Sequence, residues 1–161
     1  MFSWGGDFWD IMNFNEKESD MNAEKMALSK KHISSEVAMV TNELTEECIY
    51  TGLFGTIDSA RINTIATKLT ALCESKESSI AIIDLGNVDA IDTAVAGYLN
   101  DLGRILKFVG VTPIICGITG ELSRVTVKAG VEFDDFIIVR NLKEALKKSY
   151  ELTGYKLVQV N

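Results

Sequence analysis

The sequence predicts an α/β domain with a mixed, mostly parallel central sheet of about five strands and about four helices. Short apolar segments rich in Ile and Val alternate along the chain with longer segments whose apolar residues recur at helical spacing. This alternation is typical of parallel strands joined by crossover helices. The first two strand segments are separated only by a short polar turn, which adds an antiparallel hairpin at the start.

The regular pattern begins near residue 37. Residues 37–41 and 48–54 are predicted strands, with the polar turn at 42–47 between them. Asp58 or Ser59 then caps a helix, which the polar residues 74–79 close. The apolar residues of this helix follow the spacing of one buried face; they are Ile62, Ile65, Ala66, Leu69, Leu72 and Cys73.

The middle of the chain is predicted to be a strand, an acidic loop and a helix. Residues 80–85 form an apolar run typical of a strand covered on both faces. Gly86 and Asn87 indicate a turn, and the next helix begins at about Asp92 or Thr93 and ends near Gly110. Its apolar residues at helical spacing are Val95, Leu99, Leu102, Leu106 and Val109.

The last third repeats the alternation. Residues 113–117 and 136–139 are predicted strands, and residues 121–129 a helix stopped by Gly130. A final helix has its apolar face at Leu142, Ala145, Leu146 and Tyr150. Residues 155–160 have a strand-like composition, but no place in the sheet follows from the sequence.

Length and composition indicate one domain plus an extension. The 161 residues are 47% hydrophobic, which suffices for a core over 36–161. Residues 1–35 are aromatic and then polar, and we expect them to dock, to form a helix in part or to self-associate. The formal charge of −7 argues against nucleic acid as a partner. No apolar run reaches the ~20 residues that cross a bilayer and no secretory signal is present, so we expect a cytoplasmic protein without membrane attachment.

The usual enzyme templates are missing. The lone His32 falls in the extension, and there is no phosphate-binding glycine loop, dinucleotide fingerprint or nucleophile elbow. The three cysteines are isolated and suggest reduced core residues. We therefore expect no enzymatic activity, no cofactor and no metal.

The acidic trio Asp84, Asp89 and Asp92 supports a competing hypothesis. Carboxylates suit Mg²⁺, so a small flavodoxin-like phosphohydrolase is one alternative. A receiver-like domain with Asp84 as phosphoacceptor is another. A receiver also needs a second acidic pair and a later Lys at fixed places, and neither is evident in the sequence.

Thr93 is the candidate phosphoacceptor. A helix N-terminus presents unpaired amides and a partial positive charge, which favour a bound phosphate. Asp and Thr are also ordinary N-cap residues, each with an effect of roughly 1 kcal/mol. On these residues alone, plain capping is the better explanation.

Three segments, residues 55–61, 82–96 and 117–131, resemble the STAS domains of anti-sigma-factor antagonists. The resemblance spans about 37–152 and is strongest to the stressosome proteins of the RsbR and RsbS type. It implies the STAS fold and a non-catalytic regulatory or scaffold protein of a partner-switching system. It also implies phosphorylation of Thr93 by a GHKL-type serine/threonine kinase and removal of the phosphate by a PP2C-type phosphatase. Other STAS proteins are implied as partners in a homo- or hetero-oligomer.

The resemblance also bears on further residues. A second phosphorylated Thr of RsbR-like proteins matches Val125, which makes its neighbour Thr126 a second candidate. Thr119-Gly120 stands where the family has Arg-Pro. Only about 35 residues precede the domain, whereas RsbR-type proteins usually carry a whole sensory domain in that place. A purely structural assembly component remains an alternative. The expected partner-binding residues surround Thr93 and are Asp84, Asp89, Asp92, Ala94, Ala96 and Gly97.

Overall fold

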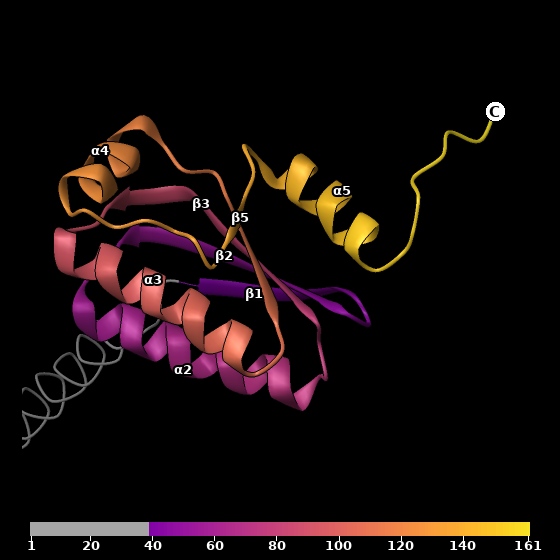
Figure 1. Cartoon of the computed structure of the whole chain (residues 1–161), viewed down its shortest axis with the longest axis horizontal. Helices are drawn as coiled ribbons and strands as arrows, with labels where there is room; N and C mark the ends of the chain where they lie inside the picture. The colour runs from indigo at the N-terminus through magenta and orange to yellow at the C-terminus, as the bar shows by residue number, and fades with distance from the viewer. Residues whose placement is uncertain (1–38) are drawn as a thin grey trace, which may run out of the picture. The chain divides into compact units, whose positions relative to one another are not determined.

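The computed structural model describes residues 39–161, and in this range it has five strands and four helices (Figure 1). The strands are β1 (Met39–Thr45), β2 (Cys48–Thr56), β3 (Ile80–Ala90), β4 (Thr112–Cys116) and β5 (Ile137–Ile138). The helices are α2 (Ser59–Ser75), α3 (Thr93–Phe108), α4 (Gly120–Lys128) and α5 (Leu142–Leu152). The predictions for residues 1–35 lie outside the described residues.

The strands form one mixed sheet in the order β1-β2-β3-β4-β5. The β1–β2 pair is antiparallel and the other three pairs are parallel. The hairpin arises because only two residues separate β1 from β2, whereas the parallel pairs are joined through helices. The predicted fold class is confirmed.

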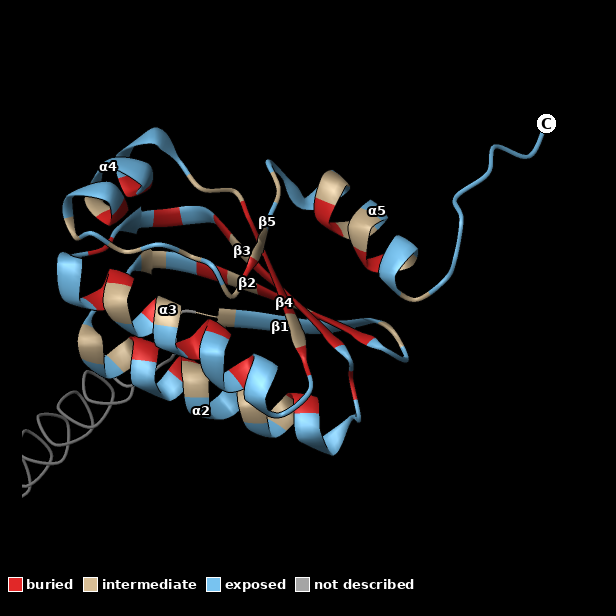
Figure 2. Cartoon of the chain, viewed as in Figure 1, coloured by how far each residue is buried: buried red, intermediate tan, exposed pale blue. Residues whose placement is uncertain are grey.

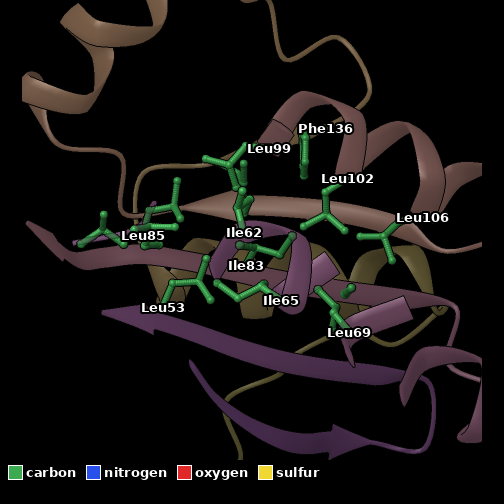
Figure 3. Packing of buried hydrophobic residues seen from close by; sticks show 14 of the residues in the cluster. Leu53, Ile62, Ile65, Leu69, Ile83, Leu85, Leu99, Leu102, Leu106 and Phe136 are labelled. Carbon is green, nitrogen blue, oxygen red and sulfur yellow. The ribbon is translucent and has the colours of Figure 1, made fainter. Parts of the chain in front are cut away.

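The sheet is covered by helices on both faces. Figure 1 shows α2 and α3 side by side on one face and α5 on the other. Strand periodicity explains how β3 serves both layers. Ile83 and Leu85 belong to the large core with α2 and α3 (Figure 3). Ile82, whose side chain points to the other face, belongs to the smaller cluster beneath α5. Figure 2 shows the buried positions concentrated in the central strands and on the sheet-facing sides of α2 and α3.

β3 differs from its prediction. Gly86 and Asn87 do not turn the chain, and the strand continues to Ala90. Its extension stays paired with a lengthened β2, with Phe54 opposite Asn87 and register irregularities on either side. Pairing of the backbone groups overrides the local turn preference, because the bulges accommodate the mismatch. The acidic loop therefore shrinks to residues 91–92.

Two smaller features complete the fold. β1 extends to Thr45, so the hairpin turn is shorter than predicted. Residues 155–160, despite their composition, form no strand. In the range 39–161 no helix combines the length and apolar character needed to cross a membrane.

Candidate functional site

Thr93 is the first residue of α3. Asp92 directly before it is the N-cap: its Oδ1 accepts a hydrogen bond from the Val95 amide at 2.8 Å. Thr93 itself is exposed, and its hydroxyl makes no hydrogen bond with any residue in 39–161. Capping therefore explains Asp92 but not Thr93, whose hydroxyl is open to another protein.

The segment that presents Thr93 is anchored to its neighbours. The carboxyl ends of β2 and β3 lie at one edge of the sheet because the strands are parallel. There the Ile57 amide donates to the Ala90 carbonyl at 3.2 Å. Arg61 Nη1 donates to the Thr56 carbonyl at 2.7 Å and so fixes the same connection from the α2 side. Thr93 therefore follows a strand end that these hydrogen bonds hold in place.

The surroundings of Thr93 along the chain are acidic. Asp89 and Asp92 are both exposed, and neither takes part in an ion pair among the described residues. Ala94 is exposed beside Thr93, and Gly97 is half-buried one turn further on. These residues form the accessible part of the predicted partner surface, with negative side chains and a small apolar patch.

Asp84 lies elsewhere. It is a residue of β3, six residues before the strand ends at Ala90, which is about 20 Å along the strand at a rise of 3.3 Å per residue. Its Oδ2 accepts a hydrogen bond from the Tyr50 hydroxyl at 3.1 Å, and its Oδ1 accepts one from the Gly86 amide at 2.9 Å. Asp84 lies in the strand predicted over 80–85, but β3 continues past Leu85, so Asp84 does not lie beside Thr93 as expected of a partner-binding residue.

A polar cluster surrounds Asp84 on the sheet. Parallel pairing puts Cys116 opposite Asp84, and burial together with the nearby Asp84 carboxylate raises the pKa of the Cys116 thiol to about 12. Burial and the same carboxylate also raise the pKa of Tyr50. Gly117 leaves room for this arrangement: a Cβ there would lie 2.6 Å from Asp84 Oδ1. Sequence reasoning missed the cluster because its members are distant in the chain.

The acidic trio is not gathered. Asp84 has its own hydrogen-bond partners, and Asp92 caps α3. Among residues 39–161 no group of three His, Cys, Asp or Glu residues is placed to hold a metal ion. The phosphohydrolase alternative needs these carboxylates together, and the fold separates them.

Two further predicted site residues are buried. Ala96 is fully buried in the core with 0% exposure, so it is no part of a partner-binding surface in this conformation. Thr126 is 7% exposed, and its hydroxyl donates to the Ser123 carbonyl at 2.9 Å. This burial argues against Thr126 as a second phosphoacceptor in this conformation.

Comparison with known proteins identifies the family. The family model described as the STAS domain matches residues 38–153. The chain belongs to the STAS domain family. The RsbT co-antagonist protein RsbRB of Bacillus subtilis is 27% identical over 128 residues, which cover 80% of this chain and 46% of that protein. The chain therefore spans about half the length of the curated relatives it matches.

Solved structures support the fold. RsbS from Moorella thermoacetica aligns with a TM-score of 0.61 and 17% identity, over 74% of this chain and 98% of that one. The anti-sigma-factor antagonist SpoIIAA in its unphosphorylated form aligns with a TM-score of 0.59 and 17% identity, over 76% of this STAS chain and 100% of SpoIIAA. At these identities the likeness shows the fold alone.

Proposed function

We propose that this STAS protein is a phosphorylatable, non-catalytic component of a stressosome-like partner-switching system. In this proposal a GHKL-type kinase transfers phosphate from ATP to Thr93, and a PP2C-type phosphatase removes it. The observation that carries the proposal is that Thr93 is exposed at the start of α3 and that its hydroxyl bonds to no residue in 39–161. The similarity to an RsbT co-antagonist and to the fold of RsbS supports the same class of system.

The local structure suits a phosphate that stays on the surface. The first-turn amides of α3 and the partial positive charge of its N-terminus favour an anion at Thr93. The Val95 amide is already satisfied by Asp92, so the fold does not depend on the phosphate. We therefore expect phosphorylation to leave the domain folded.

The change acts on partners through charge. A phosphate adds about −1.5 to −2 charges beside Asp89 and Asp92, which are exposed and unpaired among the described residues. Like-charge repulsion and the cost of desolvating this group weaken any interface packed over Ala94. A partner that was bound before phosphorylation is released. A partner with a basic surface instead binds more tightly.

Phosphate mapping tests the assignment. The purified chain is incubated with a GHKL-type kinase from the same genome and ATP, and the phosphopeptide is located by mass spectrometry. We expect one phosphate on Thr93, none on Thr93→Ala and full incorporation in Thr67→Ala, a matched change at an exposed threonine of α2. Modification of Thr93→Ala to the same extent contradicts the proposal.

A second experiment separates the switch from a purely structural role. The kinase affinity and the mass of the assembly are measured for Thr93→Glu, which mimics part of the phosphate charge. We expect kinase binding to weaken at least tenfold, equivalent to about 1.4 kcal/mol. If both quantities match the unmodified protein, the structural alternative is the better description.

The remaining parts of the proposal concern setting and assembly. Association with other STAS proteins and a cytoplasmic location follow from the same class of system. The cysteines agree with a reducing compartment: Cys48, Cys73 and Cys116 are buried and free of disulfide bonds.

A further inference from the structure

The segment after α5 carries apolar side chains that stay largely exposed, although the Tyr155 ring packs edge-on against Tyr150 of α5 at a centroid distance of 6.2 Å. It runs away from the sheet without a strand partner (Figure 1). Its aromatic and aliphatic residues are 61% to 88% exposed; they are Tyr155, Leu157, Val158 and Val160. Aromatic and β-branched residues favour strands. We propose that residues 155–160 add as an antiparallel strand to β1 of a second copy of this chain, in a reciprocal exchange.

β1 offers the receiving edge. Among the described residues it pairs only with β2, so no strand in the range 39–161 occupies its outer edge. Its seven residues contain no Pro or Lys, the residues with which proteins commonly protect such edges. Val40 and Leu44 add exposed apolar side chains to the strand. An edge of this kind accepts an extended segment through main-chain hydrogen bonds.

The reach of the chain favours a second copy over the same molecule. The Tyr155 amide donates to the Tyr150 carbonyl at 2.8 Å, which fixes the start of the segment on α5. Cys48 of β2 and Ala145 of α5 share the smaller buried cluster, which places α5 over the face that contains the start of β2. The outer edge of β1 is two strand spacings away from β2, about 10 Å. Crossing that distance uses roughly three residues of the segment. The residues that cross cannot also pair, so the segment cannot pair along its full length with β1 of its own chain.

Charge selects the direction and register of pairing. β1 ends in an acidic region, with Glu43 in the strand and Glu46 and Glu47 in the turn. Glu43 Oε1 pairs with Lys76 Nζ at 2.7 Å, but both side chains are about half exposed, so the Glu43 carboxylate stays accessible to a second cation. An antiparallel segment with Lys156 opposite Glu43 brings its only charge to that end. The same register puts Val158 opposite Thr41 and Val160 opposite Met39, which is packed against the core. Side chains directly opposite each other share a face, so Val160 extends this apolar layer.

The same orientation permits a closed dimer. Each segment leaves its own chain from the end of α5, on the face that contains Cys48 at the start of β2, and enters β1 of the second copy at the β1–β2 turn. A two-fold axis between the two turns satisfies both conditions. The interface is then isologous and self-limiting.

Disulfide trapping tests the register and the exchange together. Full-length Thr41→Cys and Val158→Cys chains are mixed and oxidised with copper phenanthroline, and linked dimers are resolved on a denaturing gel. The native cysteines are at most 1% exposed, so they contribute little background. The matched control is Gln159→Cys, whose side chain faces the other side of the added strand. We expect at least tenfold more heterodimer with Val158→Cys than with Gln159→Cys.

Other trapping results overturn the proposal. Equal linking of both variants to Thr41→Cys contradicts the register. Absence of linked dimers contradicts strand addition. A double variant, Thr41→Cys with Val158→Cys, that links only within monomers shows that the segment pairs with its own chain.

Charge reversal supplies a measurement in solution. Lys156→Glu faces Glu43 with a like charge, and we expect about tenfold weaker dimerisation by sedimentation equilibrium. Combining it with Glu43→Lys restores dimerisation, whereas Lys143→Glu on exposed α5 leaves it unchanged. Circular dichroism verifies folding, since the segment contributes nothing to the core. Unaltered dimerisation in Lys156→Glu and after deletion of 155–161 overturns the proposal, with no bearing on Thr93.

Discussion

The Tyr50 hydroxyl donates a hydrogen bond of 3.1 Å to Asp84 Oδ2, and this contact ties β2 to β3 through their side chains. Asp84 thus has a structural role away from Thr93. We predict that Tyr50→Phe lowers the free energy of unfolding by about 1 kcal/mol, because one hydrogen bond to a carboxylate is lost. Urea unfolding measures the change, and phosphorylation of Thr93 should be unaffected. Tyr98→Phe on exposed α3 is the control; equal stability of Tyr50→Phe and the native protein contradicts the prediction.

Asp92 and Asp89 both belong to the predicted partner surface, but only Asp92 caps α3, so variants of the two residues isolate the effect of the cap on stability. Asp92 Oδ1 holds the Val95 amide at 2.8 Å, so Asp92→Ala should destabilise the domain by about 1 kcal/mol. Asp89→Ala removes an equally exposed carboxylate that caps no helix, and we expect a change in unfolding free energy within about 0.5 kcal/mol. Chemical denaturation distinguishes them. Equal losses in both variants would mean that the cap contributes nothing specific.

Two glycines of α3 provide a matched pair. A Cβ at Gly103 would lie 2.2 Å from the ring of Phe136, whereas one at Gly97 meets nothing within 4 Å. We predict that Gly103→Ala destabilises the protein by about 1 to 3 kcal/mol through overpacking. Gly97→Ala should stabilise it by up to about 1 kcal/mol through helix propensity. Thermal unfolding gives both values, and the same sign in both variants contradicts the packing described here.

Alkaline pH should destabilise the domain through its buried thiols. The pKa of the Cys73 thiol is raised to about 11 and that of Cys116 to about 12, from an ordinary value of 9.0, chiefly by burial. Above pH 9 the unfolded chain releases protons that the folded chain keeps, so stability falls as pH rises. We expect a loss of about 1 to 4 kcal/mol between pH 8 and 10.5 in urea titrations.

The variant Cys116→Ala tests whether the Cys116 thiol causes the loss of stability at high pH. Cys116→Ala should be less stable at pH 8 because a buried side chain is shortened, but its stability should fall less steeply with pH. The urea midpoint is followed over the same pH range. An unchanged slope in Cys116→Ala would show that this thiol does not cause the alkaline loss.

The sequence by itself determined the fold class and the position of Thr93 at a helix start. Both depend on local information: apolar residues at period two or 3.6 mark strands and helices, and Asp92 marks the beginning of α3. The family resemblance turned this threonine from one of two cap candidates into the expected phosphoacceptor. None of these inferences required knowledge of which segments meet in space.

Only the tertiary structure decided what surrounds each candidate. Pairing with β2 carried β3 past Gly86 and placed Asp84 beside Tyr50 and away from Thr93. Packing buried Ala96, which no helical pattern of small residues could establish. The physical reason is that strand pairing and core packing are contacts between segments distant in sequence, and their free energy overrides local preference. The exposure of residues 155–160 was equally invisible in their strand-like composition.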